Sequence, residues 1–194
     1  MQKIKVERKT KETDISLALN LAGTGLAKIS TGIGFFDHML NLFVFHGCFD
    51  LNLSCKGDLE IDAHHTVEDV GISLGQALKK GLSENKGIVR YGDAFVPMDE
   101  SLARAVVEIS GRPYLVFEAE FKNPKVGSFD TELVKEFFQG FTNHAQINLH
   151  LKILYGNNTH HQIEALFKAT AVALRQALQN DLKRKGPTST KGTL

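Results

Sequence analysis

Apolar residues alternate with polar ones in some stretches of the chain and recur at helical spacing in others. In "FDLNLSC" and "INLHLKILYG" nearly every second residue is apolar, which is typical of strands with one buried face. Further strands are predicted at "KIKVER", "ISLALNL", "GLAKIST", "DAFVPM", "LARAVVEIS" and "PYLVFEAEF". Two helices are predicted at "FFDHMLNLFVFHG" and "TELVKEFFQGFTNHA".

Two more predicted helices begin with almost the same sequence. "DAHHTVEDVGISLGQAL" starts at Asp62, and "NTHHQIEALFKATAVAL" starts at Asn158, 96 residues later. In both, apolar residues follow at intervals of three and four, which marks the buried face of a helix. Asp and Asn are both residue types that cap helix N-termini. The shared motif, apolar stripe and cap indicate an internal repeat.

The repeat gives the two halves of the chain the same element order. Each half reads βββαβα, so we expect an α+β fold of two duplicated halves, each with a sheet that is covered by helices on one side. We place the first half at residues 1–86, the second at 87–182 and a basic C-terminal tail at 183–194. Together they should form one catalytic unit.

Histidines gather in or near the predicted helix starts. Six of the eight lie there: His38, His64, His65, His144, His160 and His161. On a helix, residues i and i+1 lie about 100° apart, too wide for both histidines of a pair to hold one ion, so each pair should split between two ions. With Glu68 and Glu164, each ion would have three nitrogens and one carboxylate, which suits transition metals better than Mg or Ca. One His-His-x-x-Glu motif alone is more often a cap or a solvated face, but two copies favour metal binding.

Composition narrows the class of protein. The chain has 23 Lys and Arg against 22 Asp and Glu, which does not suggest a nucleic-acid or membrane-surface protein. No apolar run approaches the roughly 18 residues that span a bilayer, and "MQKIKVERKT" lacks the apolar core of a signal peptide. Cys48 and Cys55 are expected to be free thiols. We therefore expect a soluble cytoplasmic protein.

Several motifs, in order, resemble the imidazoleglycerol-phosphate dehydratase family. They are "GFFDHML", "DAHHTVEDVGI", "RYG", "PMDE", "GRPYLVF" and "NTHHQIEALFKA", and the resemblance extends from "ERKTKET" to "PTSTKG". It implies a monofunctional carbon–oxygen lyase of histidine biosynthesis, which converts D-erythro-imidazoleglycerol phosphate to imidazoleacetol phosphate with two Mn²⁺ ions per site. It also implies halves like ribosomal-protein S5 domain 2 and a homo-oligomer of twenty-four subunits, with active sites at the interfaces.

The resemblance also implies roles for individual residues. The implied metal ligands are His38, His64, His65, Glu68, His144, His160, His161 and Glu164. The implied substrate and phosphate contacts are Glu12, Arg90, Arg112, Lys168, Ser189 and Lys191. The candidates for proton transfer are Glu12, Glu68, Glu164 and Asp99. On sequence pattern alone, Glu12 would be a surface strand residue and the tail a disordered basic end.

The reaction has a chemical difficulty that a metal pair would solve. A proton must leave a carbon that has no carbonyl beside it, and the substrate's imidazole can act as the electron sink if it becomes a metal-bound imidazolate. A positioned carboxylate can then take the proton, and the resulting enol becomes the ketone. Two alternatives stay open: another dinuclear metal phosphoester hydrolase, or a metal-assembled scaffold or storage particle.

Overall fold

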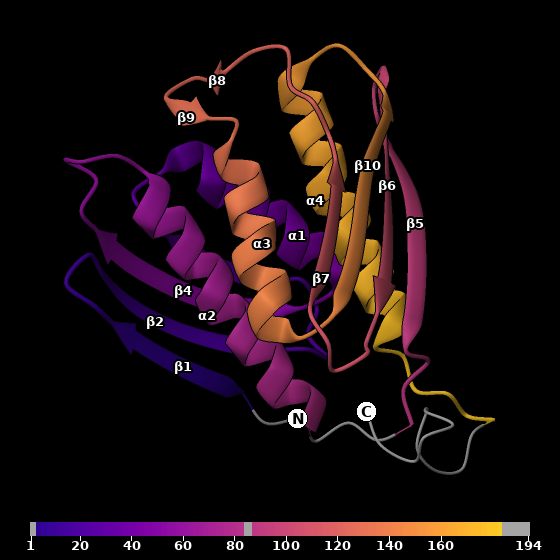
Figure 1. Cartoon of the computed structure of the whole chain (residues 1–194). Coiled ribbons are helices and arrows are strands. Elements are labelled where there is room, and N and C mark those ends of the chain that lie inside the picture. Colours follow the sequence, from indigo (N-terminus) through magenta and orange to yellow (C-terminus); the bar gives the residue numbers. More distant parts are fainter. Residues whose placement is uncertain (1–2, 84–86, 184–194) are drawn as a thin grey trace.

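The computed structural model describes residues 3–83 and 87–183 of the chain (Figure 1). The first half contains β1 (Ile4–Lys9), β2 (Thr13–Asn20), β3 (Ala27–Ser30), α1 (Gly34–Gly47), β4 (Asp50–Gly57) and α2 (His64–Ser83). The second contains β5 (Tyr91–Met98), β6 (Ser101–Glu108), β7 (Tyr114–Glu118), β8 (Lys125–Val126), β9 (Phe129–Asp130), α3 (Leu133–Ala145), β10 (Asn148–Tyr155) and α4 (Thr159–Ala177). Every predicted strand and helix is present. The hairpin of β8 and β9 was not predicted, because two-residue strands are too short to show a period.

The two halves build the same sheet. The strand orders are β1-β2-β4-β3 and β5-β6-β10-β7, with an antiparallel set of three strands and a parallel fourth strand in each. The helices lie between the two sheets, so that each sheet has one covered face and one open face (Figure 1). The predicted duplicated α+β fold, with helices on one side of each sheet, is therefore confirmed.

Alternation and helical spacing place the core where the sequence predicted it. Ile15, Leu17 and Leu19 of β2 are all buried toward the helices, whereas Ser16 between them is exposed and Ala18 is half-buried. Phenylalanines fill the space between α3 and α4, where the ring of Phe167 lies 5.1 Å from Phe137 and 4.9 Å from Phe138. The two halves are joined by other helix contacts: α2 of the first half packs against α3 of the second, and α1 of the first packs against α4 of the second.

Glycines let the backbones of α2 and α3 approach each other closely. A Cβ atom at Gly75 would lie only 2.4 Å from the carbonyl oxygen of Phe141, and one at Gly71 would lie 2.6 Å from that of Phe137. These contacts involve backbone atoms, which cannot rotate away as a side chain can. The spacing between the two helices therefore depends on the missing side chains.

We expect Gly75→Ala to lower the free energy of unfolding by about 2 kcal/mol, because the added methyl group forces the helices apart. Urea unfolding followed by circular dichroism measures the difference. Gly34→Ala is the matched control: it also lies in a helix, but no atom lies within 4 Å of its added Cβ. The close approach would be refuted if both variants unfolded at the urea concentration of the parent.

Both cysteines are free, as predicted. Burial raises the pKa of Cys55 to about 11, so its thiol stays protonated at neutral pH. Among the helices that the structure describes, none combines the length and apolar character that a membrane crossing requires.

Candidate metal centre

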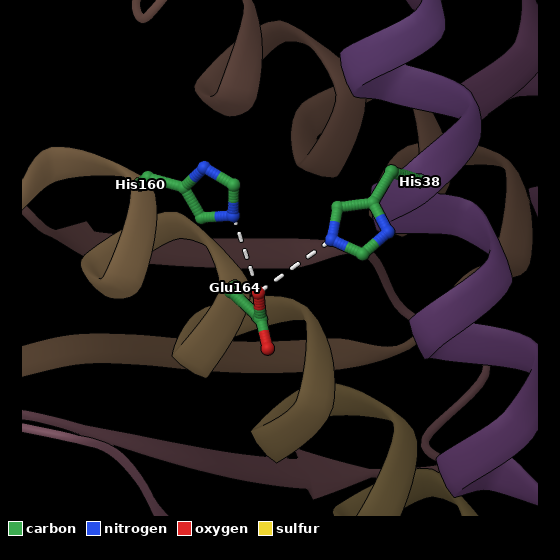
Figure 2. A group of neighbouring side chains, drawn as sticks. All are labelled: His38, His160 and Glu164. Atoms are coloured by element: carbon green, nitrogen blue, oxygen red, sulfur yellow. Dashed lines mark hydrogen bonds and ion pairs between the residues drawn. The ribbon is translucent and has the colours of Figure 1, made fainter.

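Three potential metal ligands meet between α1 and α4. His38 comes from α1, and His160 and Glu164 come from α4; one ligand atom of each lies within 4.8 Å of the others. Figure 2 shows the carboxylate of Glu164 between the two imidazoles. Its Oε2 lies 3.3 Å from Nε2 of His160 and 3.6 Å from Nε2 of His38. In the described part of the chain, this is the group that satisfies a metal-ligand geometry.

Local sequence explains why these side chains converge. Asn158 caps α4, and its side-chain oxygen accepts hydrogen bonds from the backbone N–H groups of His160 at 3.0 Å and His161 at 3.4 Å. His160 and Glu164 are four residues apart and so share one helix face. On α1, Asp37 accepts hydrogen bonds from the backbone and the hydroxyl of Thr31, which fixes the start of the helix next to His38.

The buried carboxylate of Glu164 is held in its ionised form, the form that binds a cation. Its side chain is only 7 % exposed, and Lys168, one turn further along α4, forms an ion pair with it. Burial alone would raise the pKa of Glu164, but the hydrogen bond and charge of Lys168 outweigh burial and lower this pKa below its usual value. Lys168 also lies 3.6 Å from the sulfur of Met98.

The donor set fits a divalent transition metal. An ion about 2.1 Å from each donor separates neighbouring donors by roughly 3 Å, close to the spacing around Glu164. Two imidazoles and one carboxylate are also the donor types that Mn, Fe, Co, Ni and Zn accept. The residues at this position therefore suit such an ion in both distance and chemistry.

The first half has a corresponding but looser cluster. His64 and Glu68 stand on α2 as His160 and Glu164 stand on α4, and Nε2 of His64 lies 4.0 Å from Oε2 of Glu68. Glu68 is 44 % exposed, far more than Glu164. The duplication therefore gives two equivalent pairs. Among the described residues, a histidine from another helix joins the second pair but not the first.

Internal equivalence identifies the residue of α3 that corresponds to His38. β10 starts 98 residues after β4, and the left-handed residue that ends α3, Gln146, lies 98 residues after the one that ends α1, Cys48. At this offset, His38 of α1 corresponds to Glu136 of α3. Gly140, one turn after Glu136, lies against the backbone of Glu68, with 3.0 Å between its ideal Cβ and the Glu68 carbonyl oxygen. Glu136 is thus the residue of α3 that lies level with the start of α2.

The structure places His144 away from this pair. At the same offset His144 corresponds to His46, and its Cβ lies 3.0 Å from the ideal Cβ of Gly75. Gly75 is eleven residues beyond His64, or about 16 Å along α2. Nδ1 of His144 lies 2.9 Å from the carbonyl oxygen of Gly140. His144 was chosen because the family resemblance implies it as a ligand, whereas the 98-residue offset of the strands relates His38 to Glu136.

The second histidine of each motif points to a different set of partners. The two rings of each pair diverge: their centroids are 6.1 Å apart, and their planes lie 87° apart for His64 and His65 and 79° apart for His160 and His161. We call His65 and His161 the outer histidines. Neither lies in a group with the inner histidine and glutamate of its own motif in the described residues.

Each outer histidine lies between two carboxylates. Nδ1 of His65 is 2.9 Å from Asp58 and its Nε2 is 3.7 Å from Glu12. The hydrogen bond with Asp58 raises the pKa of His65, more than its partial burial lowers it.

His161 has the same arrangement. Its Nδ1 is 2.7 Å from Glu100, and its Nε2 is 3.8 Å from Asp99. The hydrogen bond from His161, followed by those from the backbone of Asn158 and Asn157, lowers the pKa of Glu100 well below its usual value. Glu12 and Asp99, both suggested from sequence, thus stand beside the outer histidines.

The predicted phosphate contacts lie in two separate places, one near the start of α4 and one about 20 Å away from it. Lys168 adjoins Glu164, but Arg90 bonds Glu108 at 2.7 Å, and its backbone N–H donates to Ala177 at the far end of α4. Arg112 is exposed in the loop before β7, where its carbonyl oxygen accepts a hydrogen bond from Asn148 at the start of β10. From Glu164 to Ala177, and along β10, the distance is about 20 Å. Within one chain, the arginines therefore do not reach the metal-ligand cluster.

The remaining sequence-based assignments fall elsewhere. Ser189 and Lys191, with the tail from residue 184 onward, lie outside the described residues. His150 is exposed on the open face of the second sheet. Burial, followed by the charge of Lys168, lowers the pKa of His46. Sequence reasoning missed Asp58, Glu100 and Glu136, although the 98-residue offset of the strands could have identified Glu136.

Fold and site together define a duplicated α+β protein with a cluster of metal-ligand type at the start of a helix. The family model for imidazoleglycerol-phosphate dehydratase matches residues 31–174. The chain is 60% identical to the imidazoleglycerol-phosphate dehydratase of Acetivibrio thermocellus, over 100% of this chain and 99% of that protein. It is 58% identical to that of Streptococcus mutans, over 100% of both chains.

Solved structures agree. The crystal structure of imidazoleglycerol-phosphate dehydratase from Staphylococcus aureus superposes with a TM-score of 0.85 at 43% identity, over 93% of this chain and 100% of that one. The crystal structure of the enzyme from Pyrococcus furiosus, in complex with (S)-C348, superposes with a TM-score of 0.85 at 36% identity. The match covers 97% of this chain and 100% of that one. The chain belongs to the imidazoleglycerol-phosphate dehydratase family, which consists of hydro-lyases. The resemblance found in the sequence is confirmed.

Proposed function

We propose that this chain dehydrates D-erythro-imidazoleglycerol phosphate to imidazoleacetol phosphate in histidine biosynthesis, at a site that uses two divalent transition-metal ions, foremost Mn²⁺. The observation that carries the proposal is the meeting of His38, His160 and Glu164, which come from helices far apart in the sequence. Similarity to the dehydratases over the whole chain supports the choice of substrate.

We assign three ligands in each half to one ion. In the second half these are His38, His160 and Glu164. In the first half they are His64, Glu68 and, in place of His144, the carboxylate of Glu136. The outer histidines diverge from these groups, so each is assigned to an ion held by a second copy of the chain.

The chain's own carboxylates would carry the proton. When bound, the ions would act as Lewis acids that lower the pKa of the substrate's imidazole and fix its plane. The reaction removes a proton from the middle carbon of the side chain and a hydroxyl from the carbon next to the ring, and the hydroxyl leaves as water. Glu12 and Asp99, which lie beside Nε2 of the outer histidines, are placed to accept or return a proton. The enol that remains becomes the ketone.

The phosphate site would combine residues from two copies of the chain. Lys168 is close to Glu164, whereas Arg90 and Arg112 lie about 20 Å away in the same chain, so their guanidinium groups would serve the site of a neighbour. The open face of the second sheet supports self-association, because Tyr91, Phe95 and Tyr114 are all more than half exposed there. A twenty-four-subunit particle is the assembly that the family resemblance implies. The family resemblance also assigns Ser189 and Lys191 to the phosphate.

The test is turnover of imidazoleglycerol phosphate by protein stripped of metal, with the ketone product measured before and after Mn²⁺ is added back. We expect activity to disappear on stripping and to return with Mn²⁺. Metal binding without ketone formation would refute the dehydratase function. Release of free phosphate would then indicate a hydrolase, and metal-dependent assembly without turnover would indicate a scaffold.

A further inference from the structure

The hydrogen bonds to the outer histidines fix which ring nitrogen carries the proton. Asp58 Oδ2 lies 2.9 Å from Nδ1 of His65, and Glu100 Oε2 lies 2.7 Å from Nδ1 of His161. A carboxylate only accepts hydrogen bonds, so Nδ1 must donate and therefore carries a proton. In the neutral ring, Nε2 then keeps a free lone pair, which is the form that binds a metal.

We infer that Asp58 and Glu100 are positioning residues that hold His65 and His161 in the tautomer and orientation in which Nε2 binds a metal ion. The inference rests on the metal-dependent function proposed above. A carboxylate on the second nitrogen of a ligating histidine also increases the ligand's basicity, and its loss typically lowers metal affinity by about 10- to 100-fold.

The two carboxylates come from non-equivalent positions, and this supports a role at the histidine. Glu12 directly precedes β2 as Glu100 directly precedes β6, so the duplication relates these two residues. Glu12, however, lies by Nε2 of His65, and Asp58 from the longer β4–α2 loop takes the position by Nδ1. The contact is thus present in both halves although different segments supply it. Inheritance from the repeat does not explain that, whereas a shared requirement of the two histidines does.

The surroundings of Asp58 point the same way. Its Oδ1 is buried and accepts no hydrogen bond from the described residues, so the contact with His65 through Oδ2 is the one that stabilises the side chain. A half-satisfied buried carboxylate costs folding energy. Such a residue is an unfavourable choice for stability alone, but a suitable one for orienting an imidazole.

The experiment is a titration of the metal-free full-length chain with Mn²⁺, in which electron paramagnetic resonance measures the free ion. We expect two ions per chain for the parent. Asp58→Ala should weaken the binding of one ion by about 10- to 100-fold and leave the other within about twofold. Circular dichroism confirms that the variant is folded.

Glu100→Gln should weaken the binding of the other ion by a similar factor without disturbing the loop before α4. Its amide oxygen can still accept hydrogen bonds from the backbone N–H groups of Asn157 and Asn158, as Oε1 of Glu100 does at 3.1 and 2.7 Å. The amide NH₂ would then face Nδ1 of His161 and force the ring proton onto Nε2. Because the loop contacts are kept, this variant decides the question if Asp58→Ala does not fold.

Asp62→Asn is the matched control. It removes one negative charge near His65 but no hydrogen bond to the ring, and asparagine caps α4 at the corresponding position. Its affinity for both ions should equal that of the parent. The inference would be overturned if Asp62→Asn and Asp58→Ala lost the same amount of Mn²⁺ affinity. It would also be overturned if neither Asp58→Ala nor Glu100→Gln changed that affinity. A parent chain that binds no Mn²⁺ would instead overturn the proposed function itself.

Discussion

Glu136→Ala should remove one of the two bound Mn²⁺ ions and lower kcat/KM for the dehydration by roughly a thousandfold, which corresponds to about 4 kcal/mol of lost transition-state stabilisation. His144→Gln, on the same helix, should leave both ions bound and the rate close to that of the parent. Equilibrium dialysis against Mn²⁺ and steady-state kinetics measure the two effects.

The reason lies in how the two halves correspond. His38 lies 3.6 Å from Glu164, and the residue 98 positions after His38, level with the start of α2, is Glu136. Without Glu136, the first-half ion would have only His64 and Glu68 from its own chain. His144 lies beside Gly75, too far along α2 to replace it. The proposed first-half ion therefore has one more oxygen donor and one fewer nitrogen donor than the second-half ion.

A rescue variant makes this prediction specific. Glu136→His recreates at α3 the imidazole that α1 provides, so it should bind two ions and keep much of the activity that alanine loses. If His144→Gln lost an ion and Glu136→Ala did not, the assignment by internal equivalence would be wrong and the assignment from sequence would stand.

Periodicity predicted the fold well because most strands and helices are long enough for their pattern to repeat several times. Strands such as β2 and β10 have eight residues each, enough to show alternation, and the apolar stripes of α2 and α4 continue for several turns. The repeated motifs then aligned the halves and fixed the element order. The hairpin of β8 and β9 escaped detection because neither strand is long enough to show a pattern.

Side-chain partners were harder to predict than elements, and for identifiable reasons. Glu164 and His160 share a helix face, so sequence spacing alone brings them together, but the approach of His38 depends on the packing of α1 against α4. Asp58 and Glu100 belong to turns, where hydrogen-bonding direction follows from backbone geometry that has no period. Glu136 was missed because the family resemblance implied His144 as the ligand from α3. The motifs repeat after 96 residues but the strands before them repeat after 98, so the motif repeat alone does not relate His38 to Glu136.

Two inactive variants should restore activity when they are produced together in one cell. His160→Ala damages the metal-ligand cluster, and Arg112→Ala removes a proposed phosphate contact; each alone should be nearly inactive. Within one chain the two residues lie about 20 Å apart, at opposite ends of β10 and α4. If the guanidinium group serves the cluster of a neighbouring chain, random co-assembly leaves about a quarter of the sites with both parts intact.

The matched control pairs His160→Ala with Glu164→Ala. Both changes damage the same cluster, which a single chain supplies, so every mixed site stays defective and no activity should return. Recovery with the first pair and none with the second would show that active sites are shared between copies. No recovery with either pair, from particles shown by mass spectrometry to contain both chains, would mean that Arg112 does not act across the interface, and the incomplete site of the single chain would need another source of positive charge.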